Sequence, residues 1–250
     1  MIEVKELSKV FHDPKNGPVQ AVDRVTFTAQ PGQIFGLLGA NGAGKTTTLR
    51  MLSTILKPDG GSAVINGIDV AREPEKVRAS IGFLSAGTAL YGRLNPIEVL
   101  NYFGELNGLA GDRLKSRVSE LVERFQIGDF ADRLCDKLST GQKQRVNIGR
   151  AILHDPQVLF FDEPTAGLDV RTSQTILEFV EETRAIGRTV IFSTHIMSEA
   201  ERLCDYINVI DKGAIVARGT VAEIKQQGQS DVLEKAFLNV VGYQRGEVTV

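Results

Sequence analysis

The stretch Gly39-Ala40-Asn41-Gly42-Ala43-Gly44-Lys45-Thr46 decides the fold, because it joins an apolar run at residues 34–38 to a helix-like run at residues 47–52. Glycine at positions 39, 42 and 44 permits the left-handed or crowded backbone that such a loop requires. Consecutive N–H groups of the loop then converge on an anion at the positive end of the following helix. The strand, loop and helix therefore predict a phosphate-binding site.

An acidic pair further along the chain completes a nucleotide site. The apolar run at residues 158–161 ends in Asp162 and Glu163, and ligands of open α/β sheets bind just outside the carboxyl ends of the strands. We expect Lys45 to contact the β- and γ-phosphates, and Thr46 and Asp162 to coordinate Mg²⁺. The predicted phosphate contacts along the loop are Gly39, Ala40, Asn41, Gly42, Ala43, Gly44, Lys45, Thr46 and Thr47.

Glu163 follows the expected metal ligand directly, which places its carboxylate beside the attacking water. There it can orient and deprotonate that water opposite the leaving β-phosphate oxygen. The alternative is that Glu163 only caps the following turn.

The first part of the chain predicts strands followed by helices. Strand-like segments bounded by Gly, Pro or Asp stand at residues 2–7, 25–29, 34–38, 62–66 and 81–84. Helical periodicity then begins near Asn95, a suitable N-cap, and Pro96, which suits a first helical position. Ile97, Leu100, Phe103 and Leu106 follow at spacings of three, and an amphipathic stretch spans residues 114–125. We interpret residues from about 87 to about 153 as a helical insertion.

The later part of the chain predicts a parallel sheet. Buried-strand patterns at residues 158–161 and 189–193 flank a helix at residues 172–185, and strands that alternate with helices indicate a doubly wound core. A hairpin with an Asp211-Lys212-Gly213 turn and a short helix at about residues 231–241 end the chain. The predicted fold class is α/β, with an N-terminal antiparallel β region, and residues 1–250 form a single domain.

Composition excludes several other classes of protein. Hydrophobic residues make up 42% of the 250 residues and charged residues 24%, which is typical of globular proteins rather than disordered chains. Lys+Arg 29 against Asp+Glu 31 gives a net charge of −2, so we expect no nucleic acid partner. Cys135 and Cys204 are far apart in sequence, and we expect two reduced thiols that are buried or partly buried.

The sequence also predicts a cytoplasmic protein. No apolar run approaches the roughly 20 residues of a membrane-spanning helix, so another polypeptide would have to cross any membrane involved. The first seven residues alternate like a half-exposed strand, without the apolar region of a secretory signal.

Further motifs in a fixed order give a family resemblance. Leu138-Ser139-Thr140-Gly141-Gln142 precedes the acidic pair, and Gly167-Leu168-Asp169 and Ser193-Thr194-His195 follow it. This order resembles the signature loop, D-loop and switch histidine of the ATP-binding cassette (ABC) family, the nucleotide-binding subunits of ABC transporters. The resemblance extends from Ile2 to about Glu223. It implies a RecA-like P-loop NTPase core, an ABC-specific helical subdomain and ATP hydrolysis.

The resemblance also implies roles for single residues. His195 resembles the histidine that contacts the γ-phosphate, although a lone histidine at a strand end is more often structural. Phe11 resembles the aromatic residue that stacks on adenine, although an aromatic beside a strand is more often part of a core. In the family the signature loop closes over ATP bound to a second copy, which here implicates Ser139, Thr140, Gly141, Gln142 and Asp169.

A head-to-tail dimer follows from this resemblance. The helical insertion holds Ser139 away from Lys45 of its own chain, so ATP would join two copies and hydrolysis would release them. The family also implies a separate integral-membrane permease, with this chain on the inner face of the cell membrane.

Two positions depart from the family pattern. Thr140 replaces a usual glycine, which adds a Cβ but keeps the N–H. Ser85-Ala86-Gly87-Thr88 stands where the family commonly presents a glutamine near Mg²⁺. We expect water, Ser85 or Thr88 to take its place.

Residues 192–205, together with Ser139-Thr140-Gly141 and the missing glutamine, resemble the sodium-extrusion ABC ATPases of the NatA type. Drug- and lipid-exporting relatives are the alternative. A soluble ABC ATPase of translation or DNA repair would have two fused cassettes or a long coiled coil, and a GTP switch would have an Asn-Lys-x-Asp box. A non-hydrolysing module is disfavoured by Glu163 and His195.

Overall fold

A computed structural model describes residues 1–15, 17–85 and 88–243. Across these residues the core is a six-stranded sheet in the order β10-β9-β3-β8-β7-β6. Neighbouring strands from β9 to β6 are parallel, and β10 is antiparallel to β9. The strands are β3 (Ile34–Leu38), β6 (Ile81–Ser85), β7 (Val158–Asp162), β8 (Thr189–Thr194), β9 (Tyr206–Asp211) and β10 (Ala214–Gly219). Because these strands alternate with helices, the predicted α/β fold is confirmed.

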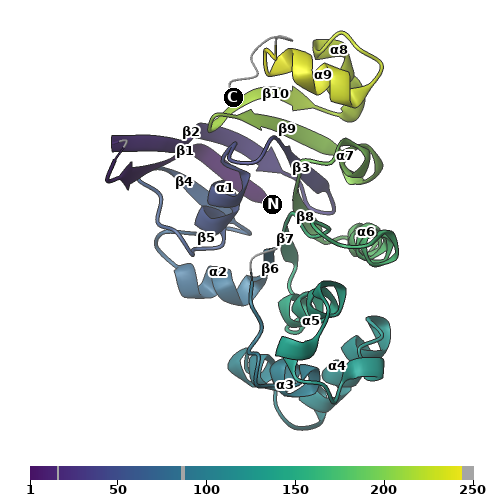
Figure 1. Ribbon diagram of the computed structural model, residues 1–250. Helices are drawn as coiled ribbons and strands as arrows, with labels where there is room; N and C mark the ends of the chain where they lie inside the picture. The colour runs from purple at the N-terminus through teal and green to yellow at the C-terminus, as the bar shows by residue number, and fades with distance from the viewer. Residues whose placement is uncertain (16, 86–87, 244–250) are drawn as a thin grey trace.

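A second, antiparallel sheet lies beside the core sheet (Figure 1). Its order is β2-β1-β4-β5, and its strands are β1 (Ile2–Asp13), β2 (Gly17–Ala29), β4 (Gly60–Ile65) and β5 (Ile68–Asp69). The predicted segments 2–7 and 25–29 were too short. Beyond Leu7 and before Val22 the two strands form an exposed ribbon joined by backbone hydrogen bonds, and a solvated ribbon shows no apolar alternation in sequence.

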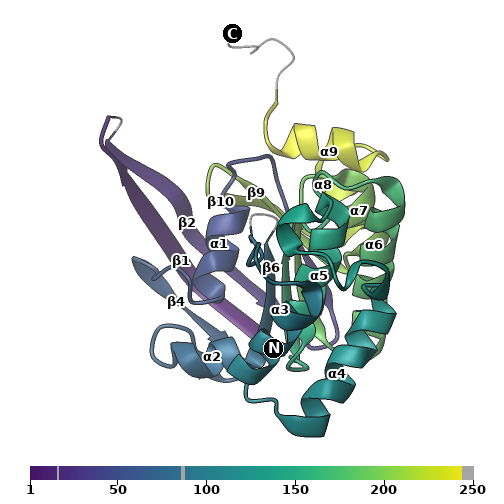
Figure 2. The ribbon, with the colours of Figure 1, turned by 60° about the horizontal axis from the view of Figure 1, so that its bottom comes forward.

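Helix α1 (Lys45–Leu52) lies between the two sheets, and α2 (Pro74–Ser80) packs below the antiparallel one (Figures 1 and 2). Leu49, Met51 and Leu52 of α1 are fully buried in a hydrophobic cluster that contains residues of both sheets. Burial of such side chains contributes roughly 1.5–3 kcal/mol each. The start of α1 is therefore fixed relative to both sheets.

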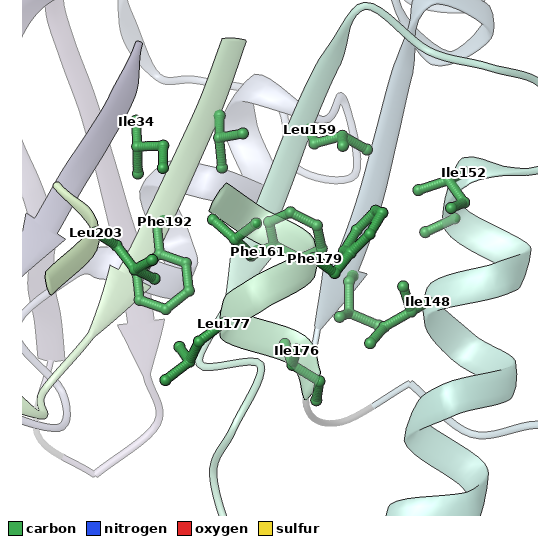
Figure 3. Packing of buried hydrophobic residues seen from close by; sticks show 14 of the residues in the cluster. Ile34, Ile148, Ile152, Leu159, Phe161, Ile176, Leu177, Phe179, Phe192 and Leu203 are labelled. Carbon is green, nitrogen blue, oxygen red and sulfur yellow. The ribbon is translucent and has the colours of Figure 1, made fainter. Parts of the chain in front are cut away.

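The opposite face of the core sheet is covered by further helices: α5 (Thr140–Ile152), α6 (Val170–Ala185), α7 (Met197–Leu203), α8 (Val221–Gln227) and α9 (Leu233–Val240). Figure 3 shows Phe161 and Phe192 of the sheet beside Ile176, Leu177 and Phe179 of α6. Helix α6 begins two residues before the predicted boundary because Asp169 caps it. Helix α8 was not predicted, since it is short and has Ile224 as its buried residue.

Helices α3 (Pro96–Leu106) and α4 (Gly111–Arg124) project beyond the β6 edge of the sheet, opposite β10, and α3 packs against α5 (Figure 1). The 3₁₀ turns η1 (Gly128–Phe130) and η2 (Cys135–Lys137) join α4 to α5. Asn95 caps α3 in a capping box with Glu98, as its position before Pro96 suggested. Leu106, which the helical spacing grouped with the apolar face, is instead 68% exposed.

These helices lie within the predicted insertion. That the whole chain forms a single domain stays a prediction. Cys135 and Cys204 are both buried and free. None of the helices in the described ranges has the length and apolar character needed to cross a membrane.

Candidate active site

The glycine-rich loop leaves β3 and enters α1 with a backbone that only glycine fits at two positions. Gly44 has a φ of 107°, and a Cβ there would lie 2.5 Å from the carbonyl oxygen of Ala21 on β2. At Gly39 a Cβ would lie 2.4 Å from the carbonyl oxygen of Ile210 on β9. The loop is therefore pressed against both sheets, which fixes the direction of its N–H groups.

The loop encloses a pocket of about 300 Å³. Its lining is Ala21, Asn41, Gly42, Gly44, Lys45, Thr46, Thr47 and Glu163. The structure thus brings predicted phosphate contacts together with the predicted base, although Glu163 is far from them in sequence. A larger groove of about 610 Å³ lies between β2 and β10, but its lining contains none of the predicted site residues.

Lys45 is buried at the floor of the pocket, with 3% of its side chain exposed. Its ammonium donates to the carbonyl oxygens of Gly39 at 2.8 Å and Ala40 at 3.0 Å. It also lies 3.1 Å from Glu163 Oε1. Three partners match the three protons of an ammonium, so the charge is held in one place.

Asp162, at the end of β7, gathers three hydroxyl groups. Its Oδ1 accepts from Thr46 Oγ1 at 2.9 Å and from Ser193 Oγ at 2.8 Å. Its Oδ2 accepts from Ser85 Oγ at 3.2 Å. Strand register explains the cluster, because Ser85 and Ser193 are opposite Asp162 on the two neighbouring strands. Oxygen ligands of this kind are those that Mg²⁺ prefers, so Thr46, Asp162 and Ser85 fit such an ion.

Ser85 was one of two predicted substitutes for the missing glutamine, and it reaches the expected metal ligand. Thr88, the other, uses its backbone: its N–H donates to Ser85 O at 3.0 Å, and its carbonyl accepts from Asn147 at 3.1 Å. Ala86 and Gly87 of the same stretch lie outside the described residues. Ser193 was missed as a site residue, because its position opposite Asp162 depends on the register of β7 and β8.

Ser193→Ala is expected to lower the free energy of unfolding by about 1–3 kcal/mol, because it removes a donor from a buried carboxylate. Ser193 is fully buried, so water cannot replace the lost hydroxyl. Urea denaturation measures the loss. Ser119→Ala, an exposed change on α4, is the control, and equal stability of the two variants would contradict the importance of the Asp162 cluster.

Glu163 has a left-handed backbone, with a φ of 50°. Its N–H is held by the carbonyl oxygen of Ser193 at 3.1 Å and by Ser193 Oγ at 3.2 Å. A left-handed non-glycine residue costs on the order of 1–3 kcal/mol, and such strain gathers at functional sites. The side chain lies between Lys45 and His195, whose Nδ1 is 3.2 Å from Glu163 Oε2. The Glu163 carbonyl oxygen also accepts from the Ala166 N–H at 3.2 Å, so the backbone closes the following turn while the side chain makes the two contacts above.

The signature residues stand at the start of α5, outside the lining of the pocket. Ser139 caps the helix, since its Oγ accepts from Gln142 N–H at 3.2 Å while Gln142 Oε1 accepts from Ser139 N–H at 3.0 Å. Ser139 and Thr140 are exposed. A Cβ on Gly141 would lie 3.0 Å from Thr172 Oγ1, so this loop packs on the start of α6.

Asp169 caps α6 and accepts from the N–H and hydroxyl of Thr172. The Thr172 N–H bond is the main reason that the pKa of Asp169 is lowered from its usual value. The signature loop and the D-loop of the same chain are therefore in contact. This contact was not predicted, because the two loops are far apart in sequence.

Phe11 lies inside β1 rather than after the first strand as predicted, and it pairs with Val19 of β2. The residue is 40% exposed, and Lys9 Nζ lies 5.8 Å from its ring centroid. Because Phe11 is exposed, the alternative that it belongs to the hydrophobic core is wrong.

Known proteins are similar to this chain in sequence and in fold. A family model described as "ABC transporter" matches residues 22–166. The ABC transporter ATP-binding protein NatA of Bacillus subtilis (strain 168) is 39% identical over 96% of this chain and 97% of its own length. The daunorubicin/doxorubicin resistance ATP-binding protein DrrA of Streptomyces peucetius is 40% identical over 93% of this chain and 69% of its own.

A solved dimeric structure, a post-hydrolysis state of an ATP-binding cassette bound to ADP and Pi, is similar with a TM-score of 0.81. It is 25% identical, and the match covers 88% of this chain and 98% of that one. The chain therefore belongs to the ABC transporter family and is one of its ATPases.

Proposed function

We propose that ATP binds with its phosphates in the loop from Gly39 to Thr47 and that Glu163 is the general base of its hydrolysis. The convergence of Lys45, Glu163 and His195 is the observation that carries this proposal. Glu163 Oε1 is 3.1 Å from Lys45 Nζ, and Oε2 is 3.2 Å from His195 Nδ1. Lys45 neutralises phosphate charge, Glu163 takes the proton of the attacking water, and His195 contacts the γ-phosphate.

Thr46 and Asp162 hold Mg²⁺ in this proposal, and Ser85 occupies the place that the family gives to a glutamine. The three hydroxyl groups around the Asp162 carboxylate support the assignment. When bound, Mg²⁺ offsets the charge of the β- and γ-phosphate oxygens. Phe11, exposed on β1, stacks on the adenine ring.

Two copies of the chain form a head-to-tail dimer around ATP in this proposal. Ser139, Thr140, Gly141 and Gln142 lie outside the pocket of their own chain, and a helix start favours negative charge. The solved cassette structure to which this chain is similar is dimeric, which supports the pairing of two copies. Gly141 packs against Thr172, close to Asp169 of the D-loop. The D-loop therefore belongs to the same proposed interface.

A separate membrane permease binds the helical region and holds the chain at the inner face of the cell membrane. Tyr91, Tyr102 and Leu106 supply an exposed patch on and before α3. The rings of Tyr91 and Tyr102 meet edge to face at 5.7 Å. Aromatic residues at a surface suit a protein partner, because they bury a large area and lose little side-chain entropy.

Leu106→Glu is expected to reduce several-fold the fraction of the chain recovered with washed membranes, because a charge enters an apolar contact. Immunoblotting of membrane and soluble fractions measures this. Ile186→Glu, an equally exposed change at the end of α6, is the control. Melting temperatures confirm that both variants fold, and equal membrane recovery would contradict the patch.

Sodium efflux is the transport process that we propose for this subunit. The near end-to-end similarity to NatA supports it, and the similarity to DrrA supports drug export as the second candidate. Radioactive sodium efflux and anthracycline accumulation, measured in cells that carry the wild type or Glu163→Gln, separate the two. Loss of sodium efflux alone supports the first candidate. Unchanged sodium efflux with raised drug accumulation supports the second.

A further inference from the structure

Glu199, on α7, is a carboxylate buried outside the nucleotide pocket. It is 6% exposed, and it accepts two hydrogen bonds across the fold. Thr165 Oγ1 donates to its Oε1 at 2.6 Å, and Thr194 Oγ1 donates to its Oε2 at 2.8 Å. Both threonines are buried as well. Because a buried carboxylate is costly unless its oxygens are paired, the three side chains form one unit.

Each threonine belongs to a segment that carries a reacting group. Thr165 is two residues after Glu163, and Thr194 directly precedes His195. Thr194 Oγ1 also accepts from Ile196 N–H at 2.9 Å, so bonds flank His195 on both sides. The Thr165–Glu199–Thr194 bridge therefore ties the loop after β7 to the end of β8.

Two further residues bind the backbone of the Glu163 loop. Ser193 binds the N–H of Glu163, and the buried side chain of Gln144 on α5 donates to Pro164 O at 2.7 Å. These attachments hold the loop backbone at residues 163 and 164. The hydrogen bond that Glu199 accepts from Thr165 Oγ1 joins this loop to the helix following His195.

We infer that Glu199 is a positioning residue for ATP hydrolysis, which holds the carboxylate of Glu163 in register with the imidazole of His195. This inference rests on the proposed roles of Glu163 and His195. Glu199 acts through Thr165 and Thr194 and does not line the nucleotide pocket. Its removal should therefore disturb the chemical step more than ATP binding, since small displacements of reacting groups reduce rates strongly.

The test compares variants that remove or keep single hydroxyl groups. Thr165→Val and Thr194→Val preserve side-chain shape and remove the donor, whereas Thr165→Ser and Thr194→Ser keep it. Each valine variant is expected to lower kcat roughly tenfold, with KM for ATP within about twofold. The serine variants should recover most of the loss.

Glu199→Gln should lower kcat less than Glu199→Ala, because an amide keeps one acceptor and adds one donor. Glu201→Gln is the matched control, since Glu201 lies on the same helix and pairs with Lys225 at the surface, 2.6 Å away. It should match wild-type turnover.

Steady-state ATPase assays on the full chain with Mg²⁺ and ATP, together with melting curves, decide the matter. A fall in kcat that serine reverses, and that does not add to the loss in His195→Ala, supports positioning. Wild-type kcat in the valine variants, or losses that simply add, overturns it. Glu163→Gln is assayed in parallel: if it is fully active, the proposed base itself fails, and if it is inactive beside unaffected valine variants, only the bridge fails.

Discussion

Glu163→Gln is expected to lower ATP turnover roughly 10²–10⁴-fold, which is the usual contribution of a general base. The amide cannot take a proton from water, but it still offers an oxygen to Lys45, 3.1 Å away in the wild type. The pocket should keep its shape, and ATP should still bind. Because the proposed dimer separates only after hydrolysis, the variant should accumulate as a dimer with ATP.

Light scattering during size-exclusion chromatography, with and without Mg²⁺ and ATP, measures this dimer, and phosphate release measures turnover. Glu234→Gln, an exposed change on α9, is the control and should turn over ATP at the wild-type rate. A Glu163→Gln protein that is monomeric and fully active would be incompatible with the proposed base.

Lys45→Ala is expected to weaken ATP binding by at least about 100-fold, or roughly 2.7 kcal/mol. The substitution removes the buried positive charge of the pocket and the hydrogen bonds that Lys45 donates to the carbonyl oxygens of Gly39 and Ala40. It also leaves Glu163 without its lysine partner, so a triphosphate would face a carboxylate whose charge the lysine no longer offsets.

Equilibrium binding of a fluorescent ATP analogue gives the Kd for this comparison. Lys57→Ala tests whether loss of any lysine has this effect, since Lys57 is exposed. If Lys45→Ala bound ATP as tightly as the wild type, the phosphate-loop assignment would be wrong.

The parallel core was predictable because its signals are local. Residues 158–161 and 189–193 are short apolar runs, and a strand buried on both faces has such a run whatever its neighbours are. The ribbon of β1 and β2 was not predictable beyond Leu7, because its outer part is held by pairing between backbones rather than by a buried face. Hydrophobic periodicity in a sequence indicates which face is buried, but it does not indicate backbone pairing between exposed strands.

The candidate site likewise contains residues that the sequence predicts and residues that only the structure identifies. Gly39, Lys45, Thr46 and Asp162 occur in contiguous motifs whose spelling reflects their chemistry. Ser193 and Glu199 act through contacts across strands and between loops. A serine at a strand end and a glutamate on a short helix are common residues, so only the register of β7 and β8 distinguishes the first, and only the fold distinguishes the second.

The capping box at Ser139 has a kinetic consequence for the proposed dimer. Reciprocal bonds between Ser139 and Gln142 already order this loop in the single chain, so little flexibility is lost when two subunits meet. Encounter should then proceed at an ordinary diffusional rate for rigid surfaces, and the lifetime of the paired state should respond to whether triphosphate or diphosphate is present. In such a cycle the hydrolysis of the bound nucleotide determines when the two subunits separate.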